Sequence, residues 1–289
     1  MNGIILVDKP MDFTSHDVVA KLRGILHERR IGHSGTLDPM ATGLLVVFVG
    51  RATRAVEFAE SHEKEYIAGL RLGIVTDTQD ITGKVLKTSE KAVSRKELSE
   101  VLPEFTGDIL QIPPMYSAIK VDGRKLYDLA RSGIEIERKS RPVTIKELEI
   151  IGEEAGDYIF RVVCSKGTYI RTLCNDIGER LGTGAALSSL RRTAAGDFSI
   201  DDAHTIDEIR ELAEKGELDK ILQPVDTLFS EYPPFTVSEW QLKKCLCGNS
   251  FEVSALNGKY RVCDVNGVFL MLANVENGIM STVKSFFEV

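Results

Sequence analysis

The sequence predicts an α+β protein in which a mixed, largely antiparallel sheet is flanked by helices and followed by a small β module. The continuous apolar run 44–49 has the length of a buried strand. Residues 143–151 and 158–164 alternate as a pair of strands across the turn-rich segment 152–157. Helical patterns with capping residues lie between these strands, and short strand patterns follow residue 234, which favours an α+β arrangement.

The first third of the chain is expected to alternate between strand and helix. Residues 3–7 form a short apolar strand, and an amphipathic helix follows from Ser15 to about residue 27. Residues 66–72 alternate in the manner of a sheet strand. Ser94 and Glu97 have the spacing of a capping box, which predicts a helix that starts there and ends near residue 102.

The middle of the chain is expected to contribute three more helices. Asp122-Gly123 is a tight-turn dipeptide that precedes a helix over 125–131. Thr168 is expected to cap a helix that Gly182 closes. Residues 205–208 form another capping box, which opens an acidic helix.

The length of 289 residues suits one large domain and one small domain. Residues 231–234, Glu-Tyr-Pro-Pro, have the composition of a linker. We therefore expect the domains to be 1–230 and 231–289. The short strand patterns of the small domain are residues 251–253, 260–265, 268–272 and 282–287.

The composition, with 43% hydrophobic and 27% charged residues, is that of an ordinary soluble globular protein. No apolar run approaches the roughly 20 residues that cross a bilayer. The N-terminus begins with a strand pattern and lacks the charged and apolar regions of a signal peptide. We expect a cytoplasmic protein that has no membrane partner.

The five cysteines indicate neither a metal site nor disulfides. They are odd in number and spread through the chain, at Cys164, Cys174, Cys245, Cys247 and Cys263. The Cys245-Leu-Cys247 spacing lacks the two-residue spacer of a zinc knuckle, and no histidine pair accompanies it. We expect reduced thiols that pack as small apolar groups.

The net charge of −7 is concentrated in one segment. Residues 201–234 hold ten acidic and three basic side chains, which accounts for the whole −7. Residues 120–146 and 161–192 each carry a charge of +4. Because phosphate binding responds to local basic patches, the acidic total does not exclude an RNA partner.

The segment 32–43, Gly-His-Ser-Gly-Thr-Leu-Asp-Pro-Met-Ala-Thr-Gly, is the strongest functional signal in the chain. Gly32, Gly35 and Gly43 are expected to let the backbone turn sharply and approach a ligand. Pro39 stiffens the loop after Asp38. A carboxylate held in a rigid, water-accessible turn has the geometry that a catalytic group needs.

This loop, together with six other segments in order, resembles the TruB family of tRNA pseudouridine synthases. The other segments are Leu-Val-Asp-Lys-Pro at 6–10 with Thr-Ser-His at 14–16, Lys-Glu-Tyr at 64–66, Pro-Met-Tyr-Ser-Ala-Ile-Lys at 114–120, Gly-Arg-Lys-Leu-Tyr at 123–127, Ser-Lys-Gly-Thr-Tyr-Ile-Arg-Thr-Leu at 165–173, and Leu-Arg-Arg-Thr at 190–193. They run from about residue 3 to about residue 198. Met11-Asp12 departs from the family, which usually has a glycine after Lys-Pro, and residues beyond 232 match only loosely.

The resemblance implies a pseudouridine synthase fold followed by a PUA-like domain. It also implies an isomerase that converts uridine 55 in the T-arm of tRNA to pseudouridine by base flipping and Asp-dependent cleavage and re-formation of the glycosidic bond. That reaction needs neither a cofactor nor a metal, and the sequence has no phosphate loop or dinucleotide fingerprint. The chain is expected to act as a monomer with no guide RNA.

The resemblance also assigns roles to individual residues. Asp38 is the essential carboxylate, and Arg171 pairs with it and holds its pKa down. Tyr66 lies against the flipped base and is a candidate for handling the carbon 5 proton. The remaining substrate-binding residues are His33, which fills the space left by the base, Tyr169 and Leu190, which line the pocket, and Lys9. Together with Lys9, the expected phosphate contacts are Lys120, Arg124, Lys125, Arg191 and Arg192.

Three alternatives remain open at this point. The nearest is a guide-RNA-dependent relative with the same catalytic domain, although such proteins usually carry extra basic segments at both ends. A non-catalytic RNA-binding or RNA-folding module is a second possibility. The third, a glycosidase, requires two carboxylates, and no obvious second one lies near Asp38 in the sequence.

Overall fold

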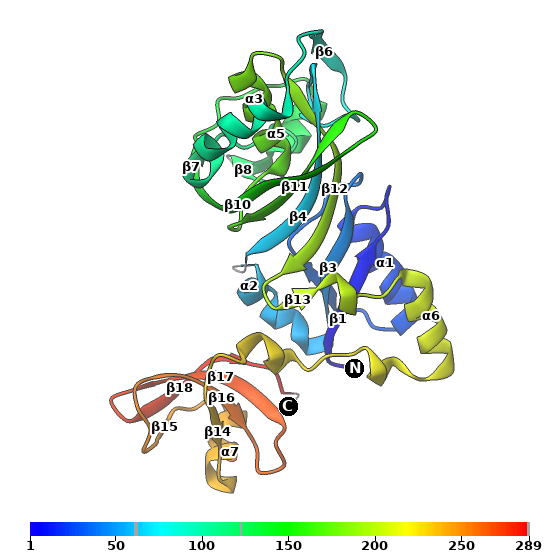
Figure 1. The fold of residues 1–289 in the computed structure, drawn as a ribbon. Coiled ribbons are helices and arrows are strands. Elements are labelled where there is room, and N and C mark those ends of the chain that lie inside the picture. The colour runs from blue at the N-terminus through cyan, green and yellow to red at the C-terminus, as the bar shows by residue number, and fades with distance from the viewer. Residues whose placement is uncertain (61–62, 122, 288–289) are drawn as a thin grey trace.

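A nine-stranded sheet forms the centre of the molecule (Figure 1). The computed structural model describes residues 1–60, 63–121 and 123–287. The strand order is β1-β3-β12-β4-β11-β10-β7, with β2 beside β3 and β13 beside β12. Strands β3 and β12 run parallel and the other neighbours are antiparallel, so the predicted mixed, largely antiparallel sheet is confirmed. These strands are β1 (Gly3–Lys9), β2 (Ile31–Ser34), β3 (Thr42–Val49), β4 (Lys64–Leu72), β7 (Gly107–Gln111), β10 (Arg141–Glu154), β11 (Asp157–Cys164), β12 (Ala185–Ala195) and β13 (Phe198–Ser199).

Helices cover this sheet at both of its ends (Figure 1). They are α1 (Ser15–Leu26), α2 (Val56–Ala59), α3 (Arg95–Val101), α4 (Leu126–Arg131), α5 (Ile170–Leu181) and α6 (Ile206–Lys215). Short 3₁₀ turns connect them at Gly50–Ala55, Leu102–Phe105, Ile200–Asp202, Leu218–Lys220 and Val225–Phe229. The small hairpins β5 (Ile74–Thr76) with β6 (Val85–Thr88), and β8 (Lys120–Val121) with β9 (Arg124–Lys125), lie outside the main sheet.

Residues 3–7 of β1 and 44–49 of β3 are apolar because both faces of these strands are buried. Ile5 and Val47 face α1 and α6, whereas Leu6 and Phe48 face the 3₁₀ turns and the C-terminal sheet. A strand covered on both faces needs no polar alternation. This explains why 44–49 is a continuous apolar run.

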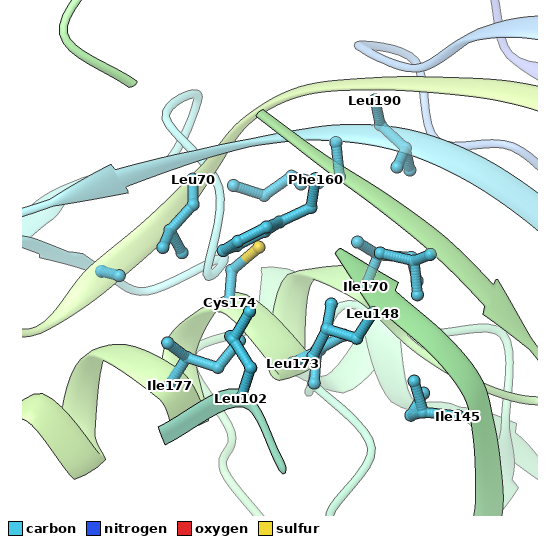
Figure 2. Packing of buried hydrophobic residues seen from close by; sticks show 14 of the residues in the cluster. Leu70, Leu102, Ile145, Leu148, Phe160, Ile170, Leu173, Cys174, Ile177 and Leu190 are labelled. Carbon is cyan, nitrogen blue, oxygen red and sulfur yellow. The ribbon is translucent and has the colours of Figure 1, made fainter. Parts of the chain in front are cut away.

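A second core lies between α5 and the strands β4, β10, β11 and β12 (Figure 2). Leu173 and Ile177 of α5 pack with Phe160 of β11 and Leu70 of β4. Burying side chains of this size stabilises the fold by about 1.5–3 kcal/mol each. The packing also fixes the position of Arg171, the second residue of the same helix.

The capping boxes predicted for α3 and α6 are confirmed, with Ser94 and Thr205 as the N-cap residues. The start predicted for α5 is wrong. Tyr169 is its N-cap residue, and the Thr168 hydroxyl donates instead to the carbonyl of Ser165 at 2.9 Å. The predicted end of α5 is confirmed, because Gly182 adopts the left-handed conformation there.

The turn predicted at Asp122-Gly123 joins β8 to β9 before α4, although Asp122 itself lies outside the described residues. The strand β12 carries the Leu-Arg-Arg-Thr motif. It has no clear period-two pattern in the sequence, because small and polar residues interrupt it. Its long pairing with β4 is a long-range contact that local propensity does not reveal.

The C-terminal residues form a separate five-stranded sheet in the order β14-β16-β17-β18-β15. Its strands are β14 (Pro234–Thr236), β15 (Phe251–Glu252), β16 (Gly258–Cys263), β17 (Phe269–Glu276) and β18 (Ile279–Ser285), with the helix α7 (Glu239–Leu246) beside them. The predicted linker is instead ordered structure, because Pro234 starts β14 and the Tyr232 carbonyl accepts a hydrogen bond from Arg261 at 3.0 Å.

Two further observations concern the cysteines and the possibility of a membrane-spanning helix. All five thiols are free, and Cys164, Cys174 and Cys245 are buried as small apolar groups, whereas Cys247 is exposed. Among the residues that the structure describes, no helix is long and apolar enough to cross a membrane.

Candidate active site

Asp38 lies in the loop between β2 and β3. Two strands, β12 and β2, pair with successive parts of the same edge of β3 next to this loop. β12 pairs with β3 at Thr42 and Gly43, and β2 pairs with it from Val46 onward. The loop is tied to α1 by Ser15, whose hydroxyl accepts from the Leu37 amide at 2.9 Å and donates to its carbonyl at 3.2 Å. The backbone around Asp38 is therefore held in place before any substrate arrives.

Two of the three loop glycines are required by geometry. Gly43 has φ +97°, and a Cβ there would lie 2.3 Å from the carbonyl oxygen of Arg192. Gly35 has φ +66°, a conformation that favours glycine. The same role predicted for Gly32 is wrong, because it lies within β2 without a positive φ and with ordinary space beside it.

The Lys-Pro motif at the end of β1 is hydrogen-bonded to the loop that carries Asp38. The Lys9 ammonium donates to the carbonyls of Phe13 at 2.5 Å, Pro10 at 2.9 Å and Pro39 at 3.3 Å. Lys9 is fully buried, and burial lowers its pKa to about 8. The phosphate contact predicted for Lys9 is therefore corrected: this side chain fastens two loops and offers no surface to RNA.

Asp12 follows the position at which the family usually has a glycine, and its own backbone adopts a conformation that glycine favours. Its φ is +65°, in the left-handed region that aspartate tolerates better than most residues. Its amide donates to the Pro39 carbonyl at 2.9 Å. Asp12 therefore forms a hydrogen bond to the loop that carries Asp38, although Met11-Asp12 departs from the family sequence.

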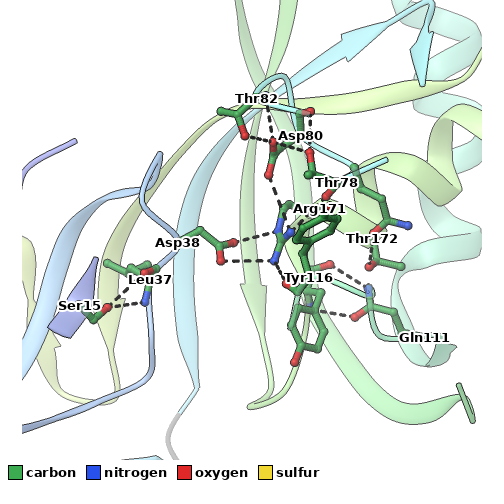
Figure 3. Close-up of polar contacts among 12 residues, drawn as sticks. Ser15, Leu37, Asp38, Thr78, Asp80, Thr82, Gln111, Tyr116, Arg171 and Thr172 are labelled. Carbon is green, nitrogen blue, oxygen red and sulfur yellow. Dashed lines mark hydrogen bonds and ion pairs between the residues drawn. The ribbon is translucent and has the colours of Figure 1, made fainter. Parts of the chain in front are cut away.

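Asp38 and Arg171 form a two-point ion pair, as Figure 3 shows. The Arg171 Nε lies 2.9 Å from Asp38 Oδ2, and Nη2 lies 3.3 Å from Oδ1. The remaining donors of Arg171 reach the carbonyls of Thr78 at 3.1 Å and Tyr116 at 2.8 Å. The Arg171 side chain is 5% exposed and that of Asp38 is 37% exposed. The pair is thus anchored on the arginine side and open on the aspartate side.

Asp80 is a second carboxylate at this site that the sequence analysis missed. Its Oδ2 lies 3.8 Å from Arg171 Nη1, on the other side of the guanidinium from Asp38 (Figure 3). Its Oδ1 accepts from the Thr82 amide and from the hydroxyls of Thr78 and Thr82. The Thr-x-Asp-x-Thr pattern was the available signal, since such residues form local turns. Because Asp80 is 4% exposed and its Oδ1 already accepts three hydrogen bonds, it lacks the access that a second glycosidase carboxylate needs.

Burial sets the protonation of Asp38 more strongly than its partner does. Burial raises the pKa of the Asp38 carboxyl, Arg171 opposes that rise, and the charge of Asp80 adds to it. Arg171 thus lowers the pKa of Asp38, as expected from the sequence, but the effect of burial is larger and the pKa is raised. The ionised form of Asp38 is therefore less stable than that of a surface aspartate, and carboxyl groups with a perturbed pKa are often the reactive groups of a site.

Gln111, at the end of β7, is a further residue that the sequence analysis missed. Its side-chain amide donates to the Tyr169 carbonyl at 3.0 Å and accepts from the Tyr169 amide at 2.8 Å. This two-point contact substitutes for a side-chain cap at the start of α5. It holds Tyr169 at the N-cap position of α5, two residues before Arg171.

Tyr66, Leu190 and Tyr169 line the site beside Asp38. Tyr66 on β4 and Leu190 on β12 belong to one cluster, which also contains Leu37, the residue before Asp38. Burial raises the pKa of the Tyr66 phenol, and Asp38 is among the charges that act on it. Burial likewise raises the pKa of the Tyr169 phenol. The structure thus gathers these three predicted residues with Asp38.

His33, on β2, and Arg192, on β12, lie next to the loop that carries Asp38. Burial, followed by the charge of Arg192, lowers the pKa of the His33 imidazole, which favours its neutral form. Arg192 is 1% exposed, and its Nε donates to the Leu44 carbonyl at 2.7 Å. The phosphate contact predicted for Arg192 is therefore wrong.

The other basic residues proposed for phosphate binding lie at or near the surface. Arg191 makes a two-point pair with Asp8, at 2.7 and 3.1 Å. Lys120 and Arg124 are exposed on the β8–β9 hairpin. The Lys125 ammonium donates to the Tyr127 hydroxyl at 3.0 Å. In the described parts of the chain, no group of three or more His, Cys, Asp and Glu side chains is arranged to hold a metal ion.

Two solved structures share the architecture of this chain. A chain from an H/ACA RNP bound to a substrate RNA containing 2′-deoxyuridine is 25% identical and has a TM-score of 0.73, covering 99% of this chain and 85% of that one. A chain from a Cbf5-Nop10-Gar1 complex is 26% identical with a TM-score of 0.74 and the same coverage.

Sequence comparison places the chain among the pseudouridylate synthases. Residues 23–170 match the model described as TruB family pseudouridylate synthase (N terminal domain). Residues 171–230 match the tRNA pseudouridylate synthase B C-terminal domain. The chain belongs to the TruB family.

Curated relatives agree with this assignment over most of their length. A tRNA pseudouridine synthase B from Clostridium kluyveri is 44% identical over 99% of this chain and 100% of its own. Proteins of the same name from Alkaliphilus oremlandii and Bacillus cereus are 48% and 44% identical, covering 86% and 88% of this chain and 82% and 87% of their own.

Proposed function

We propose that this protein is a tRNA pseudouridine synthase that isomerises uridine 55 in the T-arm of tRNA. The observation that carries the proposal is the two-point Asp38–Arg171 pair, open toward solvent only on the aspartate side. The relatives that bear the name tRNA pseudouridine synthase B support tRNA as the substrate. The T-arm position follows from the family resemblance.

The reaction conserves all of its atoms. The bond from ribose carbon 1′ to nitrogen 1 of uracil breaks, the base turns, and a bond to carbon 5 forms. Carbon 5 loses a proton and nitrogen 1 gains one, so no oxidant, reductant or cofactor is consumed. The requirement on the protein is a closed pocket in which the detached base stays while it turns.

Asp38 is the reactive group in this proposal. It attacks the anomeric carbon, attacks carbon 6 of the base, or removes a ribose proton, and in each case it must be ionised. Arg171 supports ionisation and orients the carboxylate through two charge-assisted hydrogen bonds. Because its other donors are occupied by Thr78 and Tyr116, the guanidinium has one preferred orientation.

The pocket walls suit an extruded pyrimidine. Tyr66 offers an aromatic face and a hydroxyl to the base, and Leu190 and Tyr169 offer apolar surface around it. Flipping a stacked uridine costs a few kcal/mol. His33, kept neutral by burial, is proposed to fill the space that the base leaves.

We further propose that the protein acts as a cytoplasmic monomer without a guide RNA. The solved structures that resemble it come from complexes with partner proteins. The more similar relatives, at 44–48% identity, bear the name tRNA pseudouridine synthase B, which mentions no RNP or partner protein. Activity of the purified chain alone, at the mass of a monomer in light scattering, tests this point.

The decisive experiment incubates the purified protein with an unmodified tRNA transcript, without cofactor or guide RNA. Pseudouridine is mapped by carbodiimide treatment and primer extension. Asp38→Asn is run in parallel, with the exposed Asp219→Asn as the matched control. We expect one stop in the T loop with the wild type and the control, and none with Asp38→Asn.

Other outcomes contradict parts of the proposal. Tight tRNA binding without modification would indicate a binding module or a missing guide partner. A stop outside the T loop would contradict the position. If Asp38→Asn lost tRNA binding and turnover to the same degree, Asp38 would be structural.

A further inference from the structure

Gln111 is a buried glutamine whose side-chain amide binds the backbone of one residue far away in the sequence. It is the last residue of β7 and is 2% exposed. Its Nε2 donates to the Tyr169 carbonyl at 3.0 Å, and its Oε1 accepts from the Tyr169 amide at 2.8 Å (Figure 3). A pair of opposed hydrogen bonds of this kind also joins facing residues of antiparallel strands. The contact therefore fixes both the position and the direction of the Tyr169 backbone.

The start of α5 depends on this contact because the flanking residues of the helix contribute little. Tyr169 is the N-cap residue, and its side chain makes no capping hydrogen bond to this helix, which lies entirely within the described residues. The Thr168 hydroxyl donates to the Ser165 carbonyl at 2.9 Å instead. The Tyr169 carbonyl also accepts the first helical hydrogen bond, from the Leu173 amide at 3.0 Å. Gln111 thus connects β7 directly to the first turn of α5.

The chain that follows Gln111 also reaches the side chain of Arg171. Pro113 and Pro114 stiffen this segment, since proline fixes its own φ angle. Just beyond them, the Tyr116 carbonyl accepts from Arg171 Nη2 at 2.8 Å. A single stretch of chain therefore holds the backbone before Arg171 through Gln111 and the guanidinium through Tyr116.

Arg171 needs support at both places because its side chain is long and flexible. It is the second residue of α5, so its Cα moves with the first turn of the helix. Its Nε and Nη2 lie 2.9 and 3.3 Å from the two carboxylate oxygens of Asp38, a geometry that a small shift of the helix would break. A displacement of about 1 Å in a catalytic arrangement can cost about a hundredfold in rate.

We propose that Gln111 is a positioning residue, which holds the first turn of α5 so that Arg171 meets Asp38 through two contacts. Because Gln111 is enclosed, it acts through Tyr169 and Arg171 and not by contact with RNA. The inference rests on the proposed function for the reaction in which the Asp38–Arg171 pair is used.

Single-turnover rates with excess enzyme and an unmodified tRNA transcript test this role. Gln111→Met keeps the length of the side chain and removes both hydrogen bonds. We expect its rate to fall by about ten- to a hundredfold, with tRNA affinity within about twofold of that of the wild type. A rate within about twofold of the wild-type rate would overturn the proposal.

Thr205→Ala is the matched control, because it removes the side-chain cap of α6, a helix that packs against β1 and β3. We expect it to lower the stability toward urea and to leave the rate unchanged. If Thr205→Ala lost rate to the same extent as Gln111→Met, the loss would follow stability and the proposal would be wrong.

Gln111→Glu separates positioning from a general loss of packing. A protonated carboxyl donates and accepts as the amide does, whereas a carboxylate only accepts. Burial raises the pKa of a carboxyl, so the introduced group gains its proton readily as the pH falls. We expect the rate of Gln111→Glu, relative to the wild type at the same pH, to recover as the pH falls, whereas that of Gln111→Met stays level.

A relative rate of Gln111→Glu as low as that of Gln111→Met over the whole pH range would contradict the role. If Gln111→Met fails to fold, a Gln111→Glu rate that does not recover at low pH contradicts the role instead.

A second measurement needs no turnover. With arginine labelled by ¹⁵N, the Arg171 Nε–H signal is assigned by its absence in Arg171→Lys, and Asp38→Asn shows its position when the ion pair is lost. We expect Gln111→Met to move the signal toward that position and Thr205→Ala to leave it unchanged. An unmoved signal in Gln111→Met would overturn the proposal. Wild-type turnover on tRNA reads the proposed function by itself, so the two failures are distinguishable.

Discussion

Arg171 and Asp38, 133 positions apart in the chain, meet through two contacts of 2.9 and 3.3 Å. One comes from a buried turn of α5 and the other from a loop that Ser15, Asp12 and Lys9 fasten. Because the arginine is enclosed and the aspartate is open, the pair presents an oriented carboxylate to whatever enters. The predictions below follow from how its surroundings hold it.

The pH dependence of turnover should report the raised pKa of Asp38. Burial raises it above the ordinary value of 3.8, so the active ionised form is lost at a higher pH than for a surface aspartate. We expect the single-turnover rate to fall on the acid side with a midpoint above pH 3.8. Measuring tRNA affinity across the same range separates this effect from loss of binding. A rate that follows affinity alone would contradict it.

Asp80→Asn should weaken catalysis without weakening tRNA binding. The change removes a charge that helps to raise the pKa of Asp38 and turns an amide donor toward Arg171. We expect a loss of about ten- to a hundredfold in rate, in keeping with the removal of a partner that orients a catalytic group, and an acid midpoint at lower pH than in the wild type. An unchanged midpoint would show that the charge of Asp80 does not act on Asp38, which would contradict the prediction.

Lys9→Met should destabilise the protein more than it weakens RNA binding. Methionine keeps the length of the side chain but leaves the carbonyls of Phe13, Pro10 and Pro39 without their donor. Losing these buried contacts is expected to cost about 2–4 kcal/mol of unfolding free energy. Urea denaturation measures the change, with the exposed Lys120→Met as the control. A large loss of tRNA affinity at unchanged stability would restore the phosphate contact.

Phe229→Ala should loosen the contact between the proposed domains 1–230 and 231–289. Phe229 is 1% exposed, and its ring lies 5.2 Å from Phe58 and 5.8–5.9 Å from Phe286 and Phe269 across the boundary. Removing a buried phenylalanine typically costs about 3–5 kcal/mol. We expect earlier cleavage near residue 231 in limited proteolysis, with turnover on an isolated T-arm stem-loop retained. The control is Leu256→Ala, because this side chain is 84% exposed.

Much of the fold was predictable because local patterns agree with it. The capping boxes at Ser94 and Thr205, the apolar run in β3 and the β10–β11 pair all reflect interactions within a few residues or a simple alternation. The strand β12 was missed because its sequence carries no such period, and it forms where β4 pairs with it. The helix α7 was missed although Ser238 and Gln241 form a capping box at its start.

The sequence by itself determined the Asp38 loop, the order of the motifs and the family to which they belong, since these depend on residue type and spacing alone. The tertiary structure decided which basic residues are available to RNA: Lys9 and Arg192 look like surface cations in the sequence and are buried. It also revealed Asp80 and Gln111 as partners of Arg171 and Tyr169. The physical reason is that burial, desolvation and hydrogen bonding between segments far apart in the chain depend on packing in three dimensions, which spacing along the chain does not encode.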